Sequence, residues 1–145
     1  MDTEPGIIPP LGEEDIDGAR RAFGDFLVIY KPTLERIEIY LEQIIEQAGT
    51  AYAEAYRPWR QGLHELFRGA TLISKKIPLP HPEDFIDSLR MFSFESAIQF
   101  LMDLCECCRI KLSRDWSKKF QEHIHTLLFA ISILNRKQQP QMSLY

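Results

Sequence analysis

The sequence predicts an all-α protein, an up-and-down bundle of about five to six helices in a single domain. Apolar residues recur at alternating intervals of three and four along most of the chain, which places them on one side of each helix. No segment shows the apolar–polar alternation of a half-buried strand. The chain has 145 residues, 45% of them hydrophobic, which is enough for one core. Short connections between long helices favour antiparallel neighbours, and hence an up-and-down bundle.

The chain is expected to begin with a flexible arm, residues 1–12, which is acidic and rich in proline and glycine. Its two adjacent isoleucines, Ile7 and Ile8, can dock on the bundle or on a partner. The helical bundle domain then spans residues 13–135. The polar residues 136–145 are predicted to form a flexible tail.

Two helices are predicted before residue 50. The first ends near Lys31, because the residue before Pro32 is displaced from the α region. Thr33 is the expected N-cap of the second, and Gly49 is its expected C-cap. The buried side of these helices is predicted to hold Ile16, Ala19, Phe23, Phe26 and Tyr30, then Leu34, Ile37, Leu41, Ile44 and Ala48.

The third helix is predicted over residues 50–73, where Pro58 either kinks it or starts a further helix. Residues 77–82, IPLPHP, cannot continue a helix and are expected to form an extended crossover. The predicted buried residues of this part are Tyr52, Tyr56, Trp59, Leu63, Leu66, Ala70 and Ile73, followed by Phe85, Leu89 and Phe92 in a short helix.

Two capping serines delimit the last helices. Ser93 is expected to cap the fifth and Ser113 the sixth. Their predicted apolar sides are Phe94, Ile98, Leu101, Cys105, Cys108 and Leu112, then Phe120, Ile124, Leu127, Ile131 and Leu134. Residues 124–134 are apolar nearly all round, so the last helix is either central in the bundle or part of an oligomer interface.

Charge alternates in sign along the chain. Residues 35–54 hold five acids and one base, and residues 83–106 hold six acids and one base. Residues 57–76 and residues 109–119 each hold five bases and one acid. Either oppositely charged helices lie side by side, or the two basic segments converge into a patch that binds phosphates or an acidic partner.

The three cysteines lie within four positions, too close together for a disulfide framework, which indicates a reducing, cytoplasmic location. Cys105 and Cys108 share the apolar side of their helix and are predicted to be buried, whereas Cys107 points away and is the expected reactive thiol. No second C-x-x-C completes a zinc site. A di-iron bundle needs two E-x-x-H pairs, and Glu122 with His125 forms the single copy in the sequence. We therefore predict no metal and no cofactor.

No membrane association is predicted. The longest nearly apolar stretch, residues 124–134, is about half as long as a membrane span. The acidic, proline-rich N-terminus contains no apolar run of the kind found in a secretory signal.

Arg57 and His64 are separated by six residues. This spacing resembles the R-x(4–6)-H element of the all-helical HEPN ribonucleases. The resemblance implies that His64 acts as general base or acid and that Arg57 stabilises phosphate charge. Pro58 departs from the family pattern, which usually has a polar residue at that position.

Three functions follow as hypotheses. The first is a non-enzymatic protein–protein interaction module, an adaptor or a small subunit of a larger assembly, bound to another protein or to itself. The second is a nucleic-acid-binding protein that uses the 57–76 segment together with an expected exposed tryptophan between bases. Its binding residues would be Arg109, Lys111, Arg114, Trp116, Lys118 and Lys119. The third is a ribonuclease with Arg57 and His64 as its catalytic residues.

Overall fold

The fold is that of a computed structural model, which describes residues 15–48, 50–107 and 109–138, with side chains for 15–45, 53–106 and 109–135. These residues form five helices and no strand, as the apolar periodicity predicts. The helices are α1 (Ile16–Ala48), α2 (Thr50–Ser74), α3 (Pro82–Ser93), α4 (Glu95–Cys107) and α5 (Arg114–Gln138). The predicted arm, residues 1–12, lies outside the described residues, and α5 continues three residues into the predicted tail.

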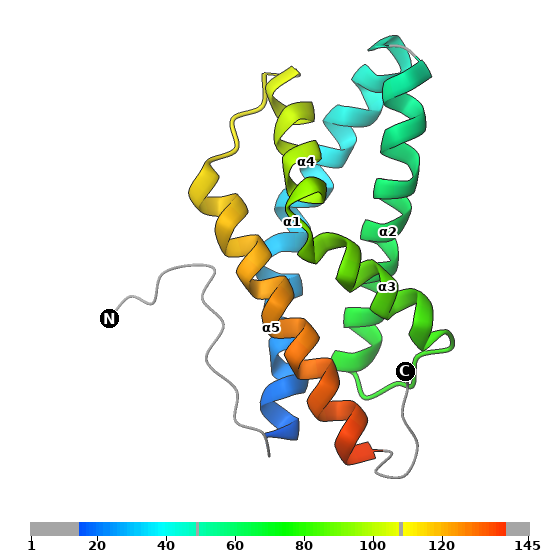
Figure 1. The fold of residues 1–145 in the computed structure, drawn as a ribbon, viewed down its shortest axis with the longest axis vertical. Helices are drawn as coiled ribbons and strands as arrows, with labels where there is room; N and C mark the ends of the chain where they lie inside the picture. The colour runs from blue at the N-terminus through cyan, green and yellow to red at the C-terminus, as the bar shows by residue number, and fades with distance from the viewer. Residues whose placement is uncertain (1–14, 49, 108, 139–145) are drawn as a thin grey trace.

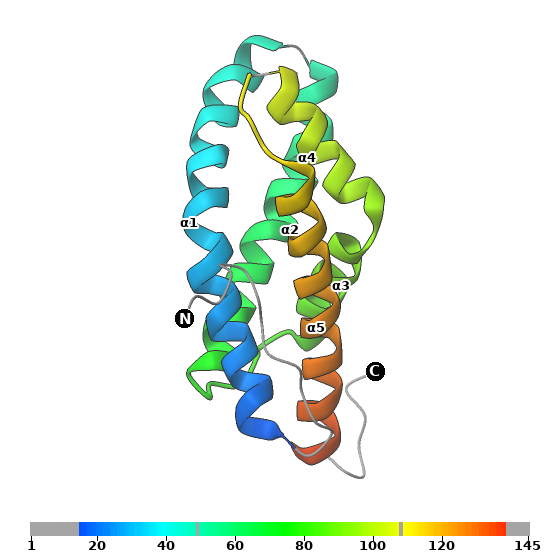
Figure 2. The same ribbon diagram turned by 90° about the vertical axis from the view of Figure 1, so that its left-hand side faces the viewer.

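The helices pack as a bundle in which the chain direction alternates. α1 and α2 form a long antiparallel pair, α3 and α4 together lead back along the molecule, and α5 returns beside α1 (Figure 1). Figure 2 shows the same order from the side, with α1 along one edge and α5 facing the viewer. α1 contacts α2 and α5, and α3 also contacts α2 and α5, so α2 and α5 are diagonal to each other.

An aromatic cluster fills the centre of the bundle. Phe120 of α5 lies 5.7 Å from Phe26 of α1 and 6.2 Å from Phe92 of α3, measured between ring centroids. All three side chains are fully buried. This cluster therefore ties α5 to α1 and α3 in the core.

α1 passes through Pro32 without a break, so the predicted helix end near Lys31 and the predicted cap at Thr33 are wrong. Proline lacks an N–H, which leaves the carbonyl of Val28 without its intrahelical donor. The side chains of Val28 and Pro32 are exposed, so this carbonyl lies on the solvent side of the helix, where water can hydrate it. Buried Tyr30, on the opposite side, continues to pack on the core.

Pro58 likewise lies inside a continuous α2 and does not start a further helix. Its side chain is exposed, while the next residue, Trp59, is buried as predicted. The Trp59 indole N–H donates to the carbonyl of Ala97 at 3.3 Å, and this bond ties α2 to α4.

The junction between α3 and α4 differs from the prediction. Ser93 is the last residue of α3 and donates its hydroxyl to the carbonyl of Arg90 at 2.6 Å, so it does not cap the next helix. Phe94 has an extended backbone (φ −82°, ψ 141°) and separates the two helices. Its side chain is 63% exposed, so its predicted place in the core is wrong. Ser113, in contrast, caps α5 as predicted, accepting a 3.0 Å hydrogen bond from the Trp116 backbone N–H.

Two helices end on a cationic residue in the left-handed region. Lys76 has a φ of 61° after α2, and Arg109 has a φ of 59° after α4. At each end a backbone N–H reaches back five residues: Ile77 to the carbonyl of Leu72 at 2.9 Å, and Ile110 to that of Cys105 at 2.7 Å. This is the Schellman motif, in which glycine is usual at the left-handed position. It ends α4 before Leu112, so the predicted continuation of that helix is wrong.

Candidate functional site

Four large hydrophobic side chains are exposed on the side of α1 that faces away from the bundle. We call this set of residues the α1 outer face. They are Val28 (77% exposed), Ile39 (59%), Tyr40 (57%) and Ile44 (36%). Ile44 was predicted to be buried, and this prediction is wrong because Ile45 takes the inward position. Because α1 is continuous, residues that lie a whole number of turns after the buried Leu34 also face the core. Ile45 lies three turns after Leu34.

These four residues are arranged in two rows. Val28 and Ile39 are eleven residues apart, about three turns, and so share one side of the helix. Tyr40 and Ile44 are four residues apart and form a second row, which lies about a third of a turn around the helix from the first. Large apolar residues exposed singly are ordinary on a protein surface, whereas a grouped set marks an interaction site.

An ion-pair network borders this face on the side of α2. Glu38 is buried and accepts the Arg60 Nε–H at 2.7 Å, and its Oε2 lies 2.5 Å from the Nε2 of His64. Glu42 lies 2.6 Å from the same Arg60 nitrogen. The hydrogen bond to Glu38 is the main cause that raises the pKa of Arg60. At Arg60, therefore, an acidic part of α1 lies beside a basic part of α2. This agrees with the first interpretation of the charge alternation, in which oppositely charged helices lie side by side.

Beside this network, Tyr56 of α2 is buried, and its hydroxyl has no hydrogen-bond partner among the described residues. Burial, reinforced by the nearby charges of Glu38 and Glu42, raises the pKa of this hydroxyl. A neutral, unpaired phenol in such a position adds no charge to the network.

Arg57 and His64, the residues suggested for phosphate chemistry, both project from the exposed side of α2. Seven positions correspond to about 10 Å along the helix axis. The Nε2 of His64 is held by Glu38, while Arg57 forms no ion pair with a described residue. The structure therefore places both on one side of α2 but joins only His64 to a charged partner.

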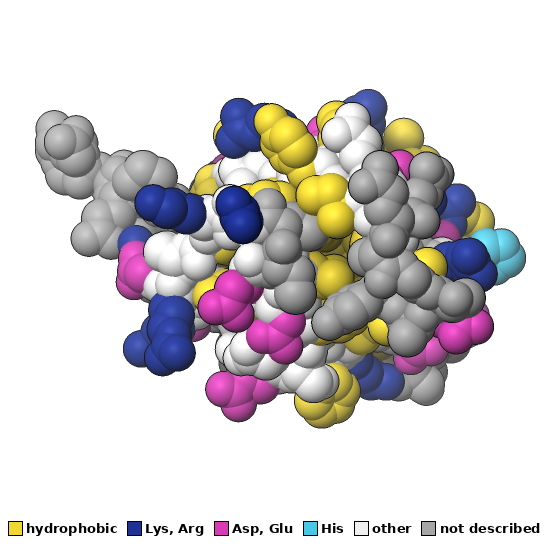
Figure 3. Space-filling model, turned by 90° about the horizontal axis from the view of Figure 1, so that it is seen from above, with side chains coloured by type: hydrophobic (Ala, Val, Ile, Leu, Met, Phe, Trp, Pro, Cys, Tyr) yellow, Lys and Arg dark blue, Asp and Glu magenta, His cyan; other side chains and the backbone are white. Residues whose placement is uncertain are grey.

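The basic residues 109–119 lie at the start of α5 and in the loop before it. Lys111, Arg114 and Lys118 line a groove between α4 and α5, together with Trp116. The α4 side of the same groove contributes the acidic residues Glu95, Asp103 and Glu106. Figure 3, a view from above, shows that basic and acidic side chains are both distributed over that end of the molecule. The other basic segment belongs to α2, which is diagonal to α5.

The remaining candidates of this segment are placed differently. Lys119 lies 3.5 Å from Asp115 of its own helix, and Arg109 is exposed at the end of α4. Trp116 is half-buried: it stacks on Phe120 at 5.5 Å with nearly parallel rings and meets the edge of Tyr30 at 5.5 Å. The expected exposed tryptophan is thus part of the aromatic cluster, which its position in the first turn of a helix did not reveal.

A buried histidine beside this cluster was missed by sequence reasoning. His123 is 6% exposed, and its ring lies 5.0 Å from that of Tyr30. Neither the His123 Nδ1 nor the Tyr30 hydroxyl has a hydrogen-bond partner among the described residues. Burial lowers the pKa of His123 to about 4, so its imidazole is neutral at neutral pH.

The described residues offer no metal-binding cluster of three or more His, Cys, Asp or Glu side chains. Cys105 is buried as predicted, and the side chains of Cys107 and Cys108 lie outside the described part of the chain. None of the helices described is long and apolar enough to cross a membrane. No family model, curated protein or solved structure matches this chain.

Proposed function

We propose that the chain is a non-enzymatic protein–protein interaction module whose α1 outer face binds an amphipathic helix of a partner protein. The observation that carries the proposal is the grouping of Val28, Ile39, Tyr40 and Ile44 on the outer side of one helix. An amphipathic helix that lies along α1 would cover both rows of these side chains.

The size of this face sets the expected strength of binding. Full burial of one such side chain contributes about 1.5–3 kcal/mol, and the exposed parts of the four side chains together amount to about 5 kcal/mol. Association costs at least about 4 kcal/mol in lost translational and rotational freedom. The face alone therefore supports weak, reversible binding, and a tighter complex needs polar contacts at its edges.

Arg36 and Gln43 supply polar groups for such contacts. Both are exposed, and both lie between the apolar rows of the α1 outer face. Arg36 forms no ion pair with a described residue, so it is available to a carboxylate of the partner. The expected partner helix is therefore apolar on one side and carries acidic residues at the border of that side.

The double variant Ile39→Glu, Tyr40→Glu tests this proposal. It places two charges on the face without touching a buried side chain, so circular dichroism should show an unchanged helix content. A pull-down from the native extract should retain a partner with the original protein and lose it with the variant. Sedimentation velocity over a concentration series shows whether the partner is a second copy of the chain.

Phe94→Glu is the matched control, because it adds a charge at an exposed aromatic residue far from α1 in the sequence. It should retain the same partner as the original protein. A strictly monomeric protein without a retained partner would contradict the proposal, as would a partner that the double variant still binds.

A further inference from the structure

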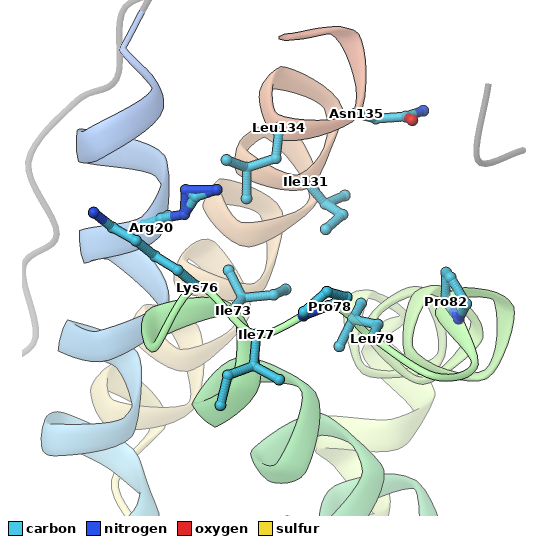
Figure 4. A pocket seen from close by; sticks show the side chains of 10 residues that line it. All are labelled: Arg20, Ile73, Lys76, Ile77, Pro78, Leu79, Pro82, Ile131, Leu134 and Asn135. Atoms are coloured by element: carbon cyan, nitrogen blue, oxygen red, sulfur yellow. The ribbon is translucent and has the colours of Figure 1, made fainter. Parts of the chain in front are cut away.

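A pocket of ≈ 190 Å³ lies at the end of the bundle where α2 passes into the crossover to α3. Figure 4 shows its side chains coming from α1, from the crossover and from the last turns of α5. Its walls are mostly apolar and include Ile73, Leu79, Ile131 and Leu134. Such a concave, apolar site is the usual form of a small-molecule site.

The charged groups of the pocket are of one sign. Arg20 and Lys76 line it, and none of the described residues that line it is acidic. Figure 4 shows these two side chains together at one end of the pocket. Neither forms an ion pair with a described residue. Two cations in proximity repel each other, and an anion between them would turn that repulsion into attraction.

The backbone of Lys76 adds a second observation. Its left-handed conformation costs stability in any residue other than glycine, and glycine is usual at this position of the motif. A cation at a helix C-terminus interacts favourably with the helix dipole, and Arg109 takes the same position after α4, so this backbone conformation alone does not distinguish Lys76. What distinguishes Lys76 is that its exposed side chain lines the pocket together with Arg20.

We propose that this pocket binds a small apolar monocarboxylate. Its carboxylate would lie between Arg20 and Lys76, where the guanidinium and ammonium groups can form charge-assisted hydrogen bonds. An acyl chain or ring of about six carbons would lie among the apolar side chains. The size follows from the volume, since an apolar cavity of about 150 Å³ holds benzene.

The direct test is a titration of the full chain with hexanoate, followed by NMR of the methyl groups. Saturable shifts are expected at Ile73, Leu79, Ile131 and Leu134, with a dissociation constant of about 1 mM for so small a ligand. Hexanol, which keeps the apolar chain but lacks the carboxylate, should bind at least about fivefold more weakly. Absence of saturable shifts at these methyl groups, or equal binding of hexanol, would overturn the proposal.

The variant Lys76→Gly separates binding from folding. It removes the ammonium group and relieves the left-handed backbone, so the protein should melt at a higher temperature while hexanoate binds at least about fivefold more weakly. Arg109→Gly is the matched control, because it makes the same change in the same motif at the end of α4. It should also raise the melting temperature but leave hexanoate binding unchanged. Equal affinity in Lys76→Gly and the original protein would overturn the role of Lys76.

Arg20→Gln provides a second, independent variant, which keeps a hydrogen-bonding side chain but removes the charge. It should weaken hexanoate binding as Lys76→Gly does. The acidic arm, residues 1–12 with Glu13 and Glu14, is the competing source of carboxylates. If nuclear Overhauser contacts placed this arm on the pocket methyl groups and hexanoate failed to displace it, the pocket would be a site for the arm, and the proposal would be wrong.

Discussion

His123 should make the stability of this protein fall as the solution is acidified. In the unfolded chain a histidine takes up a proton near pH 6.5, whereas burial lowers the pKa of His123 in the folded protein to about 4. The unfolded state therefore binds this proton first. The free energy of unfolding is fully retained above pH 6.5, decreases as the pH falls toward 4, and loses nothing more from this group below 4.

The magnitude follows from the difference between the two pKa values. About 2.5 pH units correspond to about 3 kcal/mol, a large part of the stability of a domain of this size. Desolvation of the imidazolium is the main cause, because the ring is 6% exposed and packs against Tyr30. The nearby charge of Glu122 favours the protonated ring and that of Lys119 opposes it, both as smaller effects.

Urea unfolding at half-unit pH steps from 7.5 to 3.5, followed by circular dichroism, measures this loss. The variant His123→Phe keeps an aromatic ring beside Tyr30 but cannot take up a proton. Its stability should fall by about 3 kcal/mol less than that of the original protein between pH 6.5 and 4. His125→Gln, which alters an exposed histidine of the same helix, should follow the original profile. Parallel pH profiles for His123→Phe and the original protein would refute the reasoning.

Four further predictions concern the packing, the helix ends and the basic segment. Phe120→Ala should lower the free energy of unfolding by about 3–5 kcal/mol, measured by urea unfolding, because this ring joins three helices in the core. Ser113→Ala should cost about 1 kcal/mol in the same assay through loss of the α5 cap, and an unchanged midpoint would show that the cap contributes nothing. Arg109→Gly should stabilise the protein by about 1 kcal/mol, visible as a higher melting temperature, since glycine adopts the left-handed conformation without steric cost. Labelled single-stranded RNA at low salt should show no change in fluorescence anisotropy, because acids face the bases across the α4–α5 groove. Binding that weakened steeply with salt and was lost in Arg114→Glu would instead support the nucleic-acid hypothesis.

Local signals in the sequence were reliable where one residue and its immediate neighbours decide the structure. Ser113 caps α5 because its hydroxyl meets a backbone N–H three residues on, and no other part of the fold is needed. The crossover after α2 was predicted from its closely spaced prolines, although Pro82, which was included in it, is the first residue of α3. The buried residues of α2, including Trp59, followed from the helical period alone.

Local signals failed where packing outweighed them. Pro32 should end a helix, yet buried side chains on both sides of it hold α1 together, and its unpaired carbonyl lies toward water. Ser93 is a good N-cap by type, but the chain turns at Phe94, and α4 starts at Glu95, one residue later than expected. The outward position of Ile44 follows from the continuity of α1, which the proline signal concealed.

The candidate surfaces were the least predictable part of the molecule. The sequence by itself determined the all-helical class, most of the buried residues and the alternation of charge, because these depend on the period and composition of single segments. Tertiary structure decided that Arg60 is paired with Glu38, that Trp116 is packed on Phe120, and that Arg20 and Lys76 both line an apolar pocket. Each of these facts depends on which helices are neighbours. The packing of whole helix faces against each other determines this, rather than any one residue.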